Sequence, residues 1–281
     1  MNKKKIKIAL CQLLVEGGEP ERNLNRAIEL INKATTEKVD IVLLPECMDL
    51  GWTHPSAHTS SQPIPGKYFN TLSEQAKKNN LFICAGLTEK DSKYKKNYNS
   101  AVLIDNNGKL ILKYRKINVL TEASDFYEIG SKLEIIETKF GNLGVNICSD
   151  NYRDAIDIGF VLGRMGADFI LSPSSWTVNY DITEENDPYS SKWLEPFSII
   201  SNIFEIPVIS TTSVGYIVGG PFEGRKMVGC SLATDKKGVL IKGSFNEFSS
   251  DIQYIEIPFN ENKKLKGTQI GPILRKKGYL K

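Results

Sequence analysis

Three residues with chemically useful side chains, Glu46, Lys116 and Cys148, each stand at the end of a short apolar run. A carboxylate can act as a general base, an ammonium group can stabilise an oxyanion, and a thiolate is a nucleophile. Each residue alone has a simpler explanation, as a surface carboxylate, an ordinary strand-end lysine or a buried structural cysteine. Because α/β folds place their functional side chains at strand ends, we treat all three as candidate catalytic residues.

The elements that would position them follow from hydrophobic periodicity, in which short apolar runs alternate with longer amphipathic ones. Strands are expected at residues 6–11, 41–45, 81–88, 100–104, 110–115, 143–148, 169–173, 208–212, 228–233, 240–242 and 253–257. Helices are expected at residues 21–37, 68–78, 152–165 and 192–204. Such alternation predicts an α/β fold, in which helices cover buried sheets.

Two segments depart from simple strand–helix alternation. Residues 105–109 form a polar turn between two expected strands, and residues 234–238 repeat this hairpin pattern near the C-terminus. A mixed sheet or a pair of stacked sheets therefore fits better than a doubly wound Rossmann fold. No linker-like stretch interrupts the pattern, so residues 1–281 are expected to form a single domain. The tail at about residues 259–281 could pack on a partner subunit.

Composition argues against several classes of protein. Lys and Arg outnumber Asp and Glu by 36 to 33, and this small excess does not imply a nucleic-acid partner. No run approaches the ~18 apolar residues of a membrane span, and Lys7 and Gln12 interrupt the N-terminal run that could suggest a signal peptide. The five cysteines form no CxxC pair, which argues against a zinc site or disulfide framework and favours the cytoplasm.

The order of the three candidate residues and their local sequences are informative together. Leu-Pro-Glu ends at Glu46, and Tyr-Arg-Lys ends at Lys116. Gly-Val-Asn-Ile-Cys-Ser-Asp contains Cys148. In this order they resemble the nitrilase superfamily of carbon–nitrogen hydrolases. The resemblance extends over nearly the whole chain, from residues 8–12 as a first strand to residues 229–238 as a late hairpin.

The resemblance implies a four-layer αββα sandwich with mixed sheets, which commonly pairs through its helices into a homodimer or higher homo-oligomer. It also implies a mechanism. Glu46 would take the Cys148 proton, and the thiolate would attack the substrate carbonyl carbon. Lys116 and the backbone N–H of Ser149 would hold the oxyanion. Because water would then hydrolyse the thioester, neither a metal nor an organic cofactor is expected.

The family usually carries a second glutamate between the lysine and the cysteine, which helps to position the substrate and the lysine. Glu122 matches that pattern, being followed by aromatic residues and a glycine, and Glu128 is the alternative. Either could equally be a solvated loop carboxylate.

Three further side chains, with Ser149, are candidate substrate-binding residues. His54 lies in the loop just past the expected base, and Trp176 follows the strand after the nucleophile, where the family often lines its pocket. Tyr152 comes soon after the nucleophile itself. The simpler explanations are a surface histidine for His54 and an ordinary core aromatic for Trp176.

The residues after the nucleophile bear on the reaction. Nitrile-cleaving members often show Cys-Trp-Glu, whereas this chain has Cys148-Ser149-Asp150, so nitrile hydrolysis is disfavoured. The preferred substrate is a small amide or carbamoyl compound that releases ammonia or an amine. Two alternatives stay open: an acyltransferase that passes the same thioester to an amine, and a non-catalytic binding protein on the same fold.

Overall fold

Alternating side chains of the first strand pack against two different layers of the molecule. The computed structural model describes residues 5–91, 93, 97–186, 190–258 and 278. In β1 (Lys5–Gln12), Ile8 and Leu10 join one buried apolar cluster, whereas Ala9 and Cys11 join another. Because neighbouring strand residues point to opposite faces, a strand buried on both faces belongs to an inner layer.

The first sheet contains, in spatial order, β15 (Asp251–Pro258), β1, β2 (Ile41–Leu43), β3 (Phe82–Lys90), β4 (Asn97–Ile104) and β5 (Leu110–Arg115). The neighbours β1, β2 and β3 run parallel, and the other pairs are antiparallel. Helices α1 (Pro20–Thr36) and α3 (Lys67–Asn79) connect the parallel strands, with the short α2 (Ala57–Ser60) before α3. Apolar residues of α1 and α3 pack on the outer face of this sheet.

The second sheet contains, in spatial order, β14 (Gly238–Lys242), β13 (Leu232–Asp235), β10 (Val208–Thr212), β8 (Phe169–Ser174), β7 (Gly141–Val145) and β6 (Ile135–Thr138). Its central strands β7, β8 and β10 are parallel, and α4 (Asp157–Met165) and α5 (Glu195–Phe204) connect them. A small third sheet joins β11 (Val214–Tyr216), β12 (Lys226–Val228) and β9 (Thr177–Val178).

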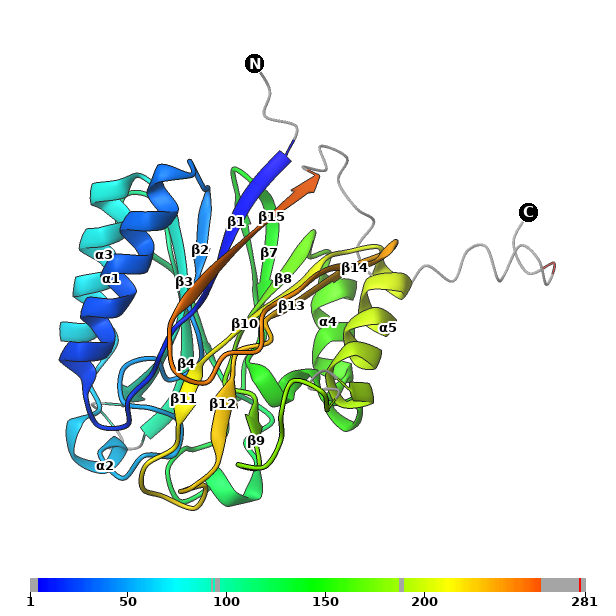
Figure 1. The fold of residues 1–281 in the computed structure, drawn as a ribbon. Coiled ribbons are helices and arrows are strands. Elements are labelled where there is room, and N and C mark those ends of the chain that lie inside the picture. The colour runs from blue at the N-terminus through cyan, green and yellow to red at the C-terminus, as the bar shows by residue number, and fades with distance from the viewer. Residues whose placement is uncertain (1–4, 92, 94–96, 187–189, 259–277, 279–281) are drawn as a thin grey trace.

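The helices and sheets form four layers. Figure 1 shows α1 and α3 on one side, the two six-stranded sheets in the middle, and α4 and α5 on the other side. Leu43 of the first sheet and Val145 of the second belong to the same buried cluster, so the inner faces of the sheets meet in a shared apolar core. The expected α/β class and αββα sandwich are confirmed, as are the mixed sheets.

Both expected hairpins are present, but several element boundaries differ from those expected, and the strand expected at residues 143–148, for example, ends at Val145. The helix expected at residues 152–165 begins only at Asp157, because the chain first forms two 3₁₀ turns, Cys148–Asn151 and Arg153–Ala155. The strand expected at residues 228–233 is interrupted, since Gly229 and Cys230 have φ of 68° and 59°, outside the strand region. Strands β6, β9 and β11 were not expected.

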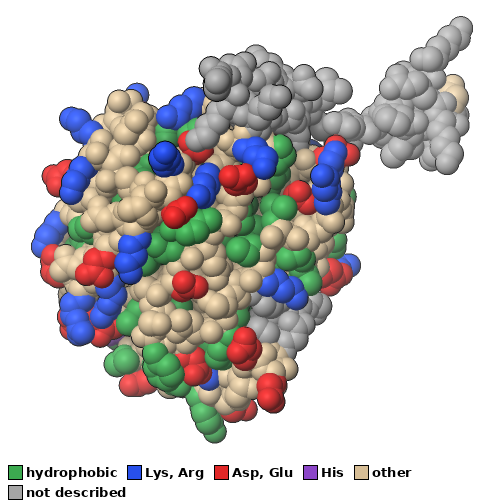
Figure 2. Space-filling view, turned by 45° about the horizontal axis from the view of Figure 1, so that its top comes forward, with side chains coloured by type: hydrophobic (Ala, Val, Ile, Leu, Met, Phe, Trp, Pro, Cys, Tyr) green, Lys and Arg blue, Asp and Glu red, His purple; other side chains and the backbone are tan. Residues whose placement is uncertain are grey.

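The surface carries both signs of charge. Figure 2 shows basic and acidic side chains interspersed over the visible face, in keeping with the small net charge. Within the described part of the chain, no helix is long and apolar enough to cross a membrane. The tail expected at residues 259–281 lies outside the described residues, apart from residue 278.

Candidate active site

Glu46, Lys116 and Cys148 come together where three strands end. Glu46 follows β2 and Lys116 directly follows β5, both in the first sheet, whereas Cys148 follows β7 of the second sheet. The three residues are buried, with exposures of 1%, 2% and 7%. Lys116 Nζ lies 2.7 Å from Glu46 Oε1, and the charges of both groups act on the Cys148 thiol. The site is thus assembled from the facing edges of the two sheets.

The two carboxylate oxygens of Glu46 have different surroundings. Oε1 accepts hydrogen bonds from Lys116 Nζ at 2.7 Å and from Asn99 Nδ2 at 2.6 Å. Oε2 is buried and receives no hydrogen bond from a nitrogen or oxygen donor of the described residues, and the Cys148 thiol hydrogen-bonds to the Glu46 carboxylate. Because buried polar atoms normally have hydrogen-bond partners, Oε2 is the oxygen of this carboxylate that is available to another group. Sequence reasoning missed Asn99, although a polar residue at the start of the apolar run 100–104 was a signal.

Cys148 adopts a strained backbone conformation that neighbouring groups hold in place. Its φ is 45°, in the left-handed region that residues with side chains rarely occupy. Asp150 stabilises the turn, because its Oδ2 accepts hydrogen bonds from Ile147 N and the Tyr114 hydroxyl, both at 2.8 Å. Asp150 Oδ1 accepts one from Asn118 N, also at 2.8 Å. These bonds tie the nucleophile turn to the segment around Lys116.

The buried side-chain amides of Asn146 and Asn151 also stabilise the turn at Cys148. Asn146 Nδ2 donates to Asn151 Oδ1 at 2.7 Å, and Asn151 Nδ2 donates to Ser172 Oγ at 2.8 Å. Asn151 Nδ2 also lies 3.3 Å from the Cys148 carbonyl oxygen. Sequence reasoning assigned no role to this pair, although an asparagine within the apolar run 143–148 was a sign of a buried polar network.

Electrostatics favours a neutral thiol in the resting site. Burial, and after it the Glu46 carboxylate, raise the pKa of Cys148 to about 12, whereas Lys116 and the backbone N–H of Ser175 act to lower it. Burial alone lowers the pKa of Lys116, but the charges of Glu46, Cys148 and Asp150 outweigh burial and raise that pKa. The site therefore holds a charged Lys116 paired with Glu46 beside an un-ionised Cys148.

One source of thiolate stabilisation that the sequence suggests, the N-terminus of a helix beginning near residue 152, is not found beside Cys148. A helix beginning near Tyr152 would have placed its positive N-terminal end beside Cys148. Helix α4 begins at Asp157 instead, with two 3₁₀ turns between it and the nucleophile. The groups that do act to lower the pKa of Cys148 are Lys116 and the backbone N–H of Ser175.

The two candidates for a second glutamate lie on the segment after Lys116. Glu122 is in the 3₁₀ turn Thr121–Ala123, and both Glu122 and Glu128 have exposed side chains. Glu122 is close enough to Tyr152 to raise the pKa of its hydroxyl, after the larger effects of burial and of the charges of Cys148 and Glu46. This effect places Glu122 in the neighbourhood of Tyr152, and its role stays a prediction.

An aromatic wall stands beside the nucleophile. Trp176 is 2% exposed and stacks on Trp193, with ring centroids 4.3 Å apart. The Tyr152 ring meets Trp193 edge-on at 5.0 Å, and Phe197 meets Trp176 edge-on at 6.1 Å. The indole Nε1 of Trp176 is buried without a hydrogen-bond partner in the described part of the chain. Sequence reasoning missed Trp193. Trp193 and Phe197 are four residues apart, which indicates one buried face of a helix but does not indicate a site.

His54 makes its contacts with Ser56 and with the glycines at positions 17 and 18. Its Nδ1 is 2.8 Å from Ser56 Oγ, and its ring packs so closely on Gly17 and Gly18 that an added Cβ would come within 2.6 Å of it. These contacts support a structural role and give no support to the expected substrate contact. His58 stacks on Phe126, with ring centroids 5.0 Å apart.

Ser149 is buried and faces the segment after Lys116. Its Oγ donates to the Asn118 carbonyl oxygen at 2.7 Å, and Asn118 Nδ2 donates back to the Ser149 carbonyl oxygen at 2.7 Å. The side chain therefore secures the turn, which leaves the backbone N–H as the group expected to meet an oxyanion.

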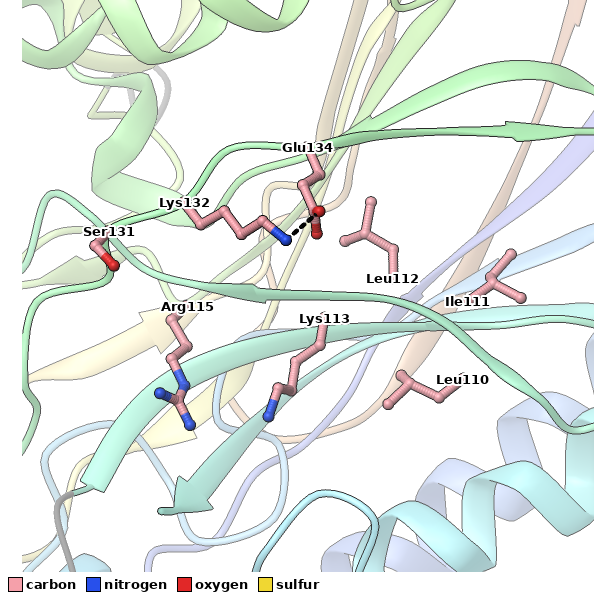
Figure 3. Close-up of a pocket in the computed structure, with 8 residues that line it drawn as sticks. All are labelled: Leu110, Ile111, Leu112, Lys113, Arg115, Ser131, Lys132 and Glu134. Carbon is pink, nitrogen blue, oxygen red and sulfur yellow. Dashed lines mark ion pairs between the residues drawn. The ribbon is translucent and has the colours of Figure 1, made fainter. Parts of the chain in front are cut away.

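A groove of about 530 Å³ along β5 is separate from this site. Its walls are formed by β5 and residues 131–134, and Figure 3 shows Lys132 and Glu134 turned toward each other as an ion pair. Lys113 and Arg115 are paired with the buried Glu89. Because its charges are already neutralised in pairs, the groove offers no obvious reactive group. In the described residues, no group of three or more His, Cys, Asp and Glu could hold a metal ion.

Proteins of known name resemble this chain in sequence. A nitrilase of Pyrococcus abyssi is 28% identical over 265 residues, covering 92% of this chain and 93% of the relative. Omega-amidase NIT3 of Saccharomyces cerevisiae is 33% identical over 190 residues, covering 61% of this chain and 64% of the relative.

Solved structures share the fold. The crystal structure of Saccharomyces cerevisiae Nit3, a member of branch 10 of the nitrilase superfamily, superposes with a TM-score of 0.76 at 25% identity and covers 91% of each chain. The family model for carbon-nitrogen hydrolases matches residues 7–266. This chain belongs to the carbon–nitrogen hydrolase family, within the nitrilase superfamily.

Proposed function

We propose that the chain hydrolyses an amide or carbamoyl C–N bond of a small molecule through a thioester on Cys148. The observation that carries this proposal is Oε2 of Glu46, which receives no hydrogen bond from a nitrogen or oxygen donor of the described residues, beside a thiol that is neutral at rest. Lys116 and Asn99 hold Oε1, so Oε2 is the oxygen left to receive a proton. A neutral nucleophile needs a base of this kind at hand.

In the first half of the reaction, Glu46 Oε2 accepts the thiol proton while the Cys148 sulfur forms a bond to the substrate carbonyl carbon. The carbonyl oxygen takes the electron pair and becomes an oxyanion, which Lys116 Nζ and the Ser149 backbone N–H stabilise. As the oxyanion collapses, the C–N bond breaks and the proton on Glu46 passes to the leaving nitrogen. Ammonia or an amine departs, and a thioester remains.

In the second half, Glu46 removes a proton from a water molecule while the oxygen of that water attacks the thioester carbon. The C–S bond then breaks, and the proton returns from Glu46 to the Cys148 sulfur. The Glu46 carboxylate thus serves alternately as base and acid. It takes up and returns one proton in each half-reaction, so no further proton donor or acceptor is required.

Relatives support an amide as the reacting group. A relative named omega-amidase is 33% identical over 190 residues, and the residue after Cys148 is Ser149 rather than tryptophan. Because another relative is named nitrilase, nitriles belong in the test. The aromatic wall of Tyr152, Trp176 and Trp193 favours a compact substrate.

The test compares wild-type protein with Cys148→Ala on a panel of small amides, carbamoyl amines and nitriles. Ammonia release and the intact mass of the protein are followed together. We expect release by the wild type alone, with a transient mass gain equal to the acyl group. Release that persists in Cys148→Ala would contradict the thioester mechanism.

The same panel separates the alternatives. Turnover that starts only when an amine acceptor is added would instead indicate an acyltransferase working through the same thioester. Release from nitriles but not amides would replace the proposed substrate class.

A further inference from the structure

Ser175 lies between the nucleophile and the base, directly after β8. It is 4% exposed and so belongs to the interior, where a hydroxyl needs partners. Its Oγ donates a hydrogen bond to the Glu46 carbonyl oxygen at 3.1 Å and accepts one from Ser213 Oγ at 3.0 Å. Its backbone N–H bonds to Cys148 and acts to lower the pKa of that thiol. One residue thus touches both reacting segments.

These contacts cross from one sheet to the other. Glu46 belongs to the first sheet, whereas Ser175 and Cys148 belong to the second. The backbone of Glu46 makes a second bond across the same boundary, from its N–H to the Ser174 carbonyl oxygen at 3.3 Å. The apolar core between the sheets is attractive but non-directional, so it does not by itself fix the base against the nucleophile.

We propose that Ser175 is a positioning residue that fixes the Glu46 base against Cys148, by a hydroxyl bond to Glu46 and a backbone bond to the nucleophile. Ser213 holds the hydroxyl in the orientation that this requires. The proposal rests on the proposed function for its turnover measurement. Its structural content, that Ser175 sets the distance between a carboxylate and a thiol, does not depend on the substrate.

The test is Ser175→Ala, with Ser210→Ala as the matched control. The alanine keeps the backbone N–H and removes only the hydroxyl. Ser210 is also a fully buried serine, and its Oγ donates to Ser174 Oγ at 2.8 Å rather than to Glu46. For each protein, kcat, KM, the thermal midpoint and the pH profile of Cys148 alkylation by iodoacetamide are measured.

In Ser175→Ala we expect kcat to fall by about ten- to a hundredfold with little change in KM, since small misplacement of a catalytic group has effects of that size. The alkylation profile should move to lower pH, because a displaced Glu46 carboxylate no longer raises the pKa of Cys148 as strongly. Ser210→Ala should change neither kcat nor the alkylation profile, even if it lowers the thermal midpoint as much as Ser175→Ala does.

An unchanged alkylation profile, or one that moves to higher pH, would overturn the proposal, as would the same loss of kcat in Ser210→Ala. Alkylation requires no substrate. The assay therefore decides on Ser175 even if the panel of amides shows that the proposed function is wrong.

Discussion

The two carboxylate oxygens of Glu46 differ in their hydrogen bonds, and the side-chain amide of Asn99 contributes to this difference. Asn99 Nδ2 and Lys116 Nζ both bind Oε1, which fixes the orientation of the side chain and leaves Oε2 available to another group. Without Asn99, the carboxylate would be held on one side by a lysine that must also meet the oxyanion. In the proposed mechanism, Asn99 would therefore hold the base and leave Lys116 to stabilise the oxyanion.

This role predicts a specific loss in Asn99→Ala. The carboxylate would keep its lysine but lose its second anchor, and we expect kcat to fall by about tenfold or more, as for other losses of catalytic orientation. Asn97→Ala is the control, because Asn97 is two residues away on the same strand and its amide binds the Ala57 carbonyl oxygen. Steady-state kinetics of both variants check the prediction, and equal losses of kcat would contradict it.

The charge of Glu46 affects the nucleophile even before any substrate binds. Burial and then this charge raise the pKa of Cys148 to about 12, and Lys116 opposes them. Glu46→Gln removes a cause that raises the pKa and leaves the cause that lowers it. We expect alkylation of Cys148 to move to lower pH while kcat falls by about a thousandfold, because the general base is gone.

Alkylation rates across a pH series, with parallel turnover assays, measure both effects in Glu46→Gln. Unfolding would also expose the thiol and lower its pKa, because burial is the largest cause that raises it, so the thermal midpoint of Glu46→Gln is measured beside the alkylation profile. A profile displaced to higher pH would mean that Glu46 does not act on the thiol through its charge.

At the scale of elements, the base depends on a close approach of β3 to the segment after β2. A Cβ added at Gly86 would lie 2.5 Å from the Glu46 Cα and 2.8 Å from the Pro45 carbonyl oxygen. Gly86 N also donates to that carbonyl at 2.9 Å. Only a residue without a side chain allows this contact, so β3 sets the position of the base through backbone atoms alone.

We therefore expect Gly86→Ala to displace Glu46 and lower kcat by about a hundredfold, while costing about 1–3 kcal/mol of stability through overpacking. Gly144→Ala on β7 is the control, because its nearest contact would be 3.4 Å from Leu162, an ordinary packing distance. Kinetics and thermal unfolding of the two variants provide the measurement. Full activity in a folded Gly86→Ala protein would show that the close approach is not required.

The elements themselves were largely predictable, and the reasons are visible in particular strands. Short apolar runs were sufficient to place β1, β3 and β8. The ends of such runs identified Glu46, Lys116 and Cys148. The 3₁₀ turns after Cys148 were not predictable, because an amphipathic pattern reads the same whether a helix begins at residue 152 or 157. Ser175 and Asn99 were missed because their partners are distant in sequence, and periodicity contains no information about contacts between sheets.

At the scale of the whole molecule, the outer helices and the edge strand of the second sheet carry exposed apolar side chains. Val161 on α4 and Ile203 on α5 are 40% and 57% exposed, and Val239 and Leu240 on β14 are 45% and 37% exposed. Figure 1 shows these two helices side by side as an outer layer of the described part of the chain. An outer layer that exposes apolar groups is a candidate interaction surface.

We propose that this face joins two copies of the chain in a homodimer, as the sequence resemblance led us to expect. Ile203→Glu should then weaken self-association by about a hundredfold, because a carboxylate would have to be buried without a partner. Val218→Glu is the matched control, since Val218 is 59% exposed and lies beyond β11, away from both helices. Sedimentation equilibrium over a range of concentrations measures the dissociation constant of each protein. A dimer that persists unchanged in Ile203→Glu, or a monomer in the wild type, would show that these helices do not form the interface.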